Sequence, residues 1–143
     1  MSGPKQLTRA SAAARPASPV PDRARALAAQ LAVLFERDRE IVGRLGAAQQ
    51  QLAAANDRLV CRSSALPGAL HDVHWQLHRA FCAYQSACEQ RRQLAVDVGE
   101  LSALLTGALT AAGYSSQQAR SANVHRLAAG TWQATGDQQE SGR

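Results

Sequence analysis

The side chains best suited to chemistry in this chain are His71, His74, His78 and Cys82, with Cys61 a short way before them. On a helix, His71, His78 and Cys82 lie within about 40° of one another and His74 lies at their edge. Imidazole and thiolate groups spaced in this way can chelate zinc or a related metal ion. The spacing matches no established zinc-finger or zinc-ribbon pattern. The alternative is that His71 and His78 face solvent and His74 borders the core.

Enzymatic chemistry finds little support in the sequence. His78 and Cys82 have the spacing of a base and a nucleophile, but no third group is placed to orient them and no pocket is implied. The glycines form no phosphate-binding loop, because they are scattered through segments with a helical pattern. We therefore expect a protein that is not an enzyme and that uses no cofactor. The glycines in question are Gly43, Gly46, Gly99 and Gly107.

The segment that precedes this cluster has the heptad pattern of a long helix. Its apolar residues recur at alternate spacings of three and four, which defines the a and d positions of a coiled-coil-like seam. Asp22 is a plausible N-cap for this helix, which should extend to about Leu59. The seam is interrupted by one charge, Asp38. Its members are Ala24, Leu27, Leu31, Leu34, Asp38, Ile41, Leu45, Ala48, Leu52, Ala55 and Leu59.

A second seam runs from Leu70 to Ala108 and also has one charged member, Arg91. Between the seams, Val60–Gly68 breaks the pattern, and Pro67 suits the first turn of a new helix. Gly113 suits the left-handed position after its end, near Ala112. A short connection makes the two helices antiparallel neighbours. We predict an all-α fold in which residues 22–112 form a long antiparallel helical hairpin.

The register of this hairpin brings Asp38 and Arg91 into adjacent layers, where they can reach each other. The simplest role of the pair is to fix the register, since buried ionic pairs are best known as determinants of specificity. A functional charged site is the alternative. If the pair is buried, removal of one partner should cost about 3–5 kcal/mol.

The apolar surface is wider than the a and d seam, because the e positions that follow d are apolar as well. Phe35, Val42 and Phe81 occupy such positions, and Trp75 lies at an outward f position suited to a contact with another protein. A face this wide indicates a helical bundle rather than a bare coiled coil. We expect self-association, with two hairpins forming a four-helix bundle through the a, d and e positions. The sequence thus favours a protein–protein interaction or scaffold module.

Residues 114–129 should form a short C-terminal helix. Ser115 and Gln118 have the spacing of a capping box, and the helix would end at Ala128, before Gly130. Arg120 and Arg126 on this helix suggest an alternative function, in which a small dimeric regulator contacts DNA with the 115–128 helix and the basic N-terminal tail. Nucleic acid is not the favoured partner, because a helix with two arginines offers few phosphate contacts.

Composition sets the remaining expectations. The chain has 143 residues and a net charge of +5, and the excess lies toward the ends, so the helical body is nearly neutral. Residues 1–21, rich in proline and free of acidic residues, should be a disordered basic tail, and 130–143 a polar tail. No apolar run reaches the length of a membrane span, and no secretory signal precedes the helices. With three cysteines, reduced thiols and a cytoplasmic location are expected.

Overall fold

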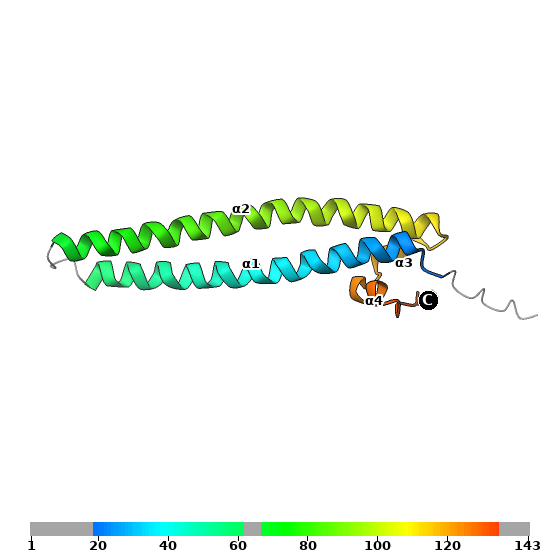
Figure 1. Ribbon diagram of the computed structural model, residues 1–143, viewed down its shortest axis with the longest axis horizontal. Coiled ribbons are helices and arrows are strands. Elements are labelled where there is room, and N and C mark those ends of the chain that lie inside the picture. Colours follow the sequence, from blue (N-terminus) through cyan, green and yellow to red (C-terminus); the bar gives the residue numbers. More distant parts are fainter. Residues whose placement is uncertain (1–18, 62–66, 135–143) are drawn as a thin grey trace, which may run out of the picture. The chain divides into compact units, whose positions relative to one another are not determined.

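The structure, a computed structural model, describes residues 19–61 and 67–134 (Figure 1). In this part of the chain 86% of the residues are helical and there are no strands. The helices are α1 (Asp22–Cys61), α2 (Pro67–Ala111), α3 (Ser116–Arg120) and α4 (Val124–Ala129). The long helices α1 and α2 pack against each other, which confirms the predicted all-α hairpin. Expectations for residues 1–18, 62–66 and 135–143 lie outside the described residues.

The chain divides into two compact units. Unit 2 is Gln30–Ala103 and contains most of α1 and α2. Unit 1 combines Met1–Ala29 with Leu104–Arg143, and its described part holds the start of α1, the end of α2, and both short helices. The predicted hairpin of residues 22–112 is therefore shared between two units, each with a core of its own.

In unit 2, hydrogen bonds between side chains show that α1 and α2 run antiparallel. Arg44 donates to Gln90 and Arg58 donates to Gln76, at 2.8 and 2.9 Å, so residue numbers fall on α2 as they rise on α1. A core cluster forms where the seam residues are largest. It consists of buried Ile41, Ala87 and Leu94, with Leu34, Leu45 and Val98 packed against it.

Burial in unit 2 differs between the two seam positions. The d residues of this unit from Ile41 to Ala55 and from Val73 to Leu94 are buried. The a residues from Asp38 to Leu59 and from Leu70 to Val98 are half-buried or exposed, whereas Leu31, also at a, is fully buried. The d row therefore forms the centre of the contact between α1 and α2. The a row lies at one edge of that contact, next to the e positions, because a and e are adjacent on a helix.

Unit 1 buries its apolar residues more completely. Leu109 and Leu127 are fully buried, and so are Ala24 and Ala28 near the start of α1. Leu105 and Ala119 complete this core. Ala28 and Leu109 occupy e positions, so within this unit the wide apolar face is covered.

The end of α2 follows the sequence expectation. Gly113 has φ +100°, the left-handed region in which glycine is favoured. The Tyr114 N–H donates to the carbonyl of Leu109, and the Gly113 N–H donates to that of Thr110, both at 3.1 Å. These two bonds form a Schellman motif, which satisfies carbonyls that the helix end leaves free.

The predicted helix of residues 115–128 is wrong in its length. Its start is right, since the Ser115 hydroxyl accepts from the Gln118 N–H and the Gln118 side chain accepts from the Ser115 N–H. The helix stops at Arg120, and Asn123 caps a second helix by accepting a 3.0 Å hydrogen bond from the Arg126 N–H. Serine and asparagine side chains compete with the helical backbone for hydrogen bonds, which favours a break between Ser121 and Asn123.

The first residues of the expected polar tail are packed in unit 1. Gly130, at φ +73°, ends α4, and the Thr131 N–H returns to the carbonyl of Arg126 at 2.9 Å. This turn brings the ring of Trp132 to 5.3 Å from that of Tyr114. Residues 130–132, which were expected to begin the polar tail, are therefore packed in unit 1.

Candidate interaction surfaces of the hairpin

The structure brings Asp38 and Arg91 together. Arg91 Nε donates to Asp38 Oδ1 at 3.0 Å, between α1 and α2 of unit 2. The Asp38 side chain remains 36% exposed and the Arg91 side chain 52% exposed. The pair is therefore not buried, and the cost of several kcal/mol expected for removing one partner of a buried pair does not apply. Both residues occupy a positions, and the a row lies at the edge of the helix contact. The pair therefore lies on the surface formed by the a and e rows.

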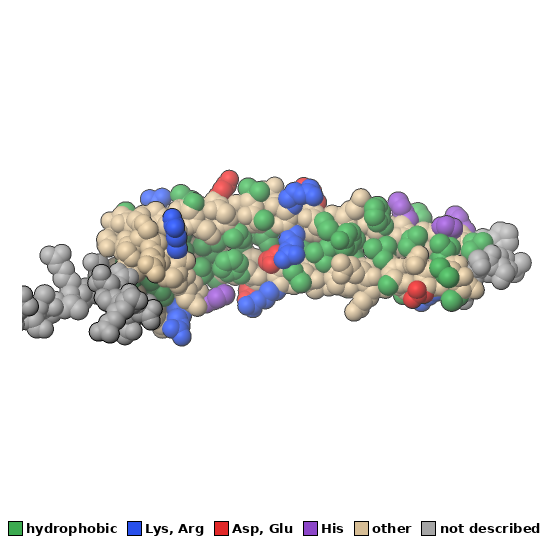
Figure 2. Space-filling view, turned by 180° about the vertical axis from the view of Figure 1, so that it is seen from behind, with side chains coloured by type: hydrophobic (Ala, Val, Ile, Leu, Met, Phe, Trp, Pro, Cys, Tyr) green, Lys and Arg blue, Asp and Glu red, His purple; other side chains and the backbone are tan. Residues whose placement is uncertain are grey.

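This surface of unit 2, which we term the apolar side, is mostly hydrophobic. Val42 is 43% exposed and Phe81 is 49% exposed, while Phe35 is half-buried. Figure 2 shows hydrophobic side chains gathered along the line between the two long helices, interrupted by acidic and basic side chains. The apolar side consists of Phe35, Val42, Leu45, Leu52, Leu77, Phe81, Tyr84 and Cys88.

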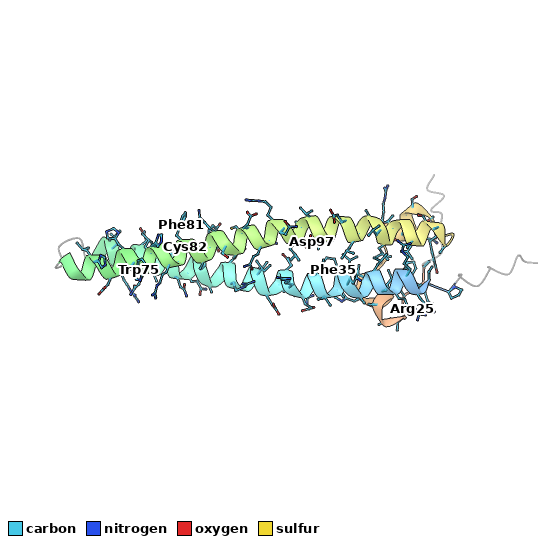
Figure 3. All side chains as sticks on the ribbon, turned by 45° about the horizontal axis from the view of Figure 1, so that its top comes forward. Arg25, Phe35, Trp75, Phe81, Cys82 and Asp97 are labelled. Atoms are coloured by element: carbon cyan, nitrogen blue, oxygen red, sulfur yellow. The ribbon has the colours of Figure 1, made fainter. Side chains whose placement is uncertain are left out.

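Trp75 is the remaining residue that was predicted to contact another protein. It occupies an f position of α2, so it does not belong to the a and e rows that form the apolar side. It is 53% exposed, with its ring 5.8 Å from that of His78 and the Arg79 guanidinium 5.5 Å from its centre. Figure 3 shows Trp75, Phe81 and Cys82 on the same half of α2. The stacking orders Trp75 on the outer surface, where it forms a small polar and aromatic cluster of its own.

Of the proposed metal ligands, the structure brings two together. Cys82 Sγ lies 3.6 Å from His78 Nε2, while His71 and His74 are exposed elsewhere on α2. Nowhere in residues 19–61 and 67–134 do three or more His, Cys, Asp or Glu side chains gather so that they could hold a metal ion. The described residues therefore lack the third protein ligand that a zinc site needs.

Arg120 and Arg126, the predicted DNA contacts, are both exposed but lie on different helices. The helix expected to carry them is split into α3 and α4, each of one to two turns. The geometry of a single recognition helix is therefore absent from this segment.

Unit 1 contains a cavity of about 460 Å³ that the sequence did not reveal. Tyr114, Trp132 and Leu127 supply apolar walls, and Arg25 is the one charged residue among those that line it. The turn at Gly130 creates this hollow by bringing Trp132 back toward α1.

The side of unit 2 opposite the apolar side carries residues that the sequence reading overlooked. Here the g positions of α1 face those of α2, and Arg44 and Arg58 hydrogen-bond to Gln90 and Gln76. Two adjoining hollows along this side are lined largely by alanine. The sequence did contain a signal for these hollows, because the d positions between Ala48 and Ala87 are nearly all alanine.

One result bears on membranes. Within α2, the segment Leu70–Ala111 contains an 18-residue window with a mean hydropathy of 1.4, so this helix could cross a membrane by length and composition alone. This corrects the expectation that no segment approaches a membrane span. The core helix of a soluble protein, which is mostly buried, passes the same test, whereas 17% of this window is buried.

Comparison with known proteins returns no match: no protein-family model, no curated protein and no solved structure is significantly similar to this chain.

Proposed function

We propose that this chain is a non-enzymatic helical interaction module that self-associates through the apolar side of unit 2. The observation that supports this most directly is the exposure of Val42 and Phe81 beside a row of half-buried leucines. Each square ångström of apolar surface removed from water contributes about 25 cal/mol, so covering this side is favourable. A continuous apolar surface on a hairpin is typical of an interaction site.

A second copy of the hairpin is the partner that fits this side best. The only seam charges on it are one acid and one base, Asp38 and Arg91. A copy related by two-fold symmetry presents the same apolar residues together with the same two charges. In such an isologous contact both copies use the same surface. Apolar residues of one copy then meet apolar residues of the other, and each charge can meet the opposite charge. Two hairpins joined in this way form a four-helix bundle.

The mass of the protein in solution tests the proposal. Light scattering should give a multiple of the 15.2 kDa chain mass at micromolar concentrations. The double variant Val42→Glu with Phe81→Glu should be monomeric, because it places carboxylates on the apolar side of both helices. Circular dichroism should show that it keeps its helix content, since neither side chain is part of the buried core.

A matched control uses two exposed valines that lie off this side, Val33 and Val96. The double variant Val33→Glu with Val96→Glu should keep the mass of the unmodified protein. If the unmodified protein remains monomeric at the highest attainable protein concentration, self-association is refuted. Equal masses for the two double variants would refute it as well.

A further inference from the structure

The side of unit 2 opposite the apolar side offers a second surface. Two hollows, of about 420 and 360 Å³, lie along α1 and α2 and share Gln51 and Ala83 in their walls. The two hollows therefore adjoin each other, and we term them together the alanine groove. We propose that it binds an acidic amphipathic helix of another protein.

The floor of the groove is made of small side chains at the centre of the hairpin contact. Ala48, Ala55, Ala80 and Ala87 are buried d residues, and all of them line it. Larger residues at d, such as Ile41 and Leu94 in the core cluster, fill the space between the helices. Alanine leaves a depression instead, and it lets a third helix approach within the 8–10 Å that separates packed helices.

The rim of the groove is cationic. Arg44, Arg58 and Arg79 line it, and no carboxylate does. None of the three forms an ion pair with another described residue, and the Arg79 guanidinium lies 5.5 Å from the centre of the Trp75 ring. Arg44 and Arg58 each give one hydrogen bond to a neutral glutamine, which leaves most of the five N–H donors of each guanidinium available.

Charge and shape together point to the occupant. Arg44 and Arg58 lie 14 residues apart on α1, or about 21 Å at 1.5 Å per residue, which corresponds to four turns of a docked helix. A helix with small apolar residues on one face can cover the alanine floor. Glutamate or aspartate at the borders of that face can then pair with the arginines on both walls, in charge-assisted and bidentate bonds.

Other occupants fit less well. A second copy that docked groove to groove would place arginine against arginine. Nucleic acid would leave the alanine floor uncovered, and no aromatic side chain lines the groove to stack on bases. An acidic helix matches both the floor and the rim.

Binding of a designed helical peptide tests the proposal. The probe is a labelled peptide of about 21 residues, or three heptads, with alanine and leucine on one face and glutamate along both borders. Fluorescence anisotropy with the full-length protein should show saturable binding that weakens as salt is added. A matched peptide with every glutamate replaced by glutamine should bind at least about tenfold more weakly.

Variants of the protein locate the site. Arg44→Gln with Arg58→Gln should weaken binding of the acidic peptide by about tenfold. Ala83→Trp should abolish it by filling the groove, and since Ala83 is exposed this change spares the core. Arg92→Gln is the control, because Arg92 already pairs with Glu89, outside the groove, and it should leave binding unchanged.

The outcomes that overturn the proposal are equally specific. They are an acidic peptide that does not bind, that binds no better than its glutamine counterpart, or that binds the Arg44 and Arg58 variant unchanged. Tighter binding of a DNA duplex at the same salt concentration would assign the arginines to nucleic acid instead. The monomeric Val42 and Phe81 variant should retain the peptide site, which keeps this test separate from that of self-association.

Discussion

Arg91 and Asp38 bridge the two long helices of unit 2 through a hydrogen bond of 3.0 Å, at seam positions that are otherwise apolar. Their partial exposure decides what the contact can contribute. In an isolated hairpin, water competes for both groups, so the pair contributes modestly to stability. The two charges still disfavour any register of the two helices in which Asp38 or Arg91 would face an apolar layer. We propose that the pair acts chiefly on register.

The first prediction concerns the energy of this pair. A double-mutant cycle with Asp38→Ala and Arg91→Ala should give a coupling of about 0.2–1 kcal/mol, because both side chains are partly solvated. The measurement is denaturant unfolding in the monomeric background of Val42→Glu with Phe81→Glu. Added salt should reduce the coupling. A coupling of about 3 kcal/mol or more in that background would show that the pair is buried.

The second prediction concerns two glycines at and near the end of α2. Gly113→Ala should lower the free energy of unfolding by about 1–2 kcal/mol, since an alanine side chain is strained at φ +100°. Gly107 is the matched control, because it lies within α2 and an added Cβ there meets no atom within 4 Å. Gly107→Ala should raise stability by about 0.5–1 kcal/mol. The midpoint of thermal unfolding, followed by circular dichroism, should therefore fall for Gly113→Ala and rise for Gly107→Ala.

The third prediction concerns the core of unit 1. Leu109→Ala should destabilise the protein by about 2–5 kcal/mol, because this fully buried side chain leaves a cavity when it is removed. Leu104, five residues earlier on the same helix, is exposed. Leu104→Ala should change stability by no more than about 0.5 kcal/mol. Similar losses for the two variants in chemical denaturation would contradict the assigned core.

The fourth prediction concerns the cap of α3. This helix has five residues, too few to persist without its N-cap. Ser115→Ala removes the hydroxyl acceptor and should cost about 0.5–2 kcal/mol locally. Hydrogen exchange should accelerate in the amides of residues 116–120 and remain unchanged in unit 2. The neighbouring Ser116→Ala, outside the capping box, should leave exchange in α3 nearly as it is.

The heptad pattern was sufficient to predict the hairpin. Residues such as Leu31, Ile41 and Leu94 recur with a period that only a helix pair can bury, and capping signals at Gly113 and Ser115 specified where elements end and begin. Such signals are local, so they can be read from the sequence without knowledge of tertiary packing. The register followed from the same seam, which must place apolar layers opposite one another.

The burial of individual seam positions could not be predicted in this way. Heptad notation treats a and d alike, yet along most of unit 2 the d residues are buried and the a residues are not. Asp38 and Arg91, both at a positions, therefore remain partly exposed. The break after Arg120 was missed because the sequence of Ser121–Asn123 suits both a continuous helix and a new cap. The choice between them depends on how α3 and α4 pack in unit 1.

The turn at Gly130 has a practical consequence for spectroscopy. It places Trp132 in unit 1, whereas the chain's other tryptophan, Trp75, belongs to unit 2. Each of the two units thus carries one tryptophan, and Trp132 has Tyr114 beside it as an energy donor. Emission from the single-tryptophan proteins Trp75→Phe and Trp132→Phe would report whether the two units melt together or in sequence.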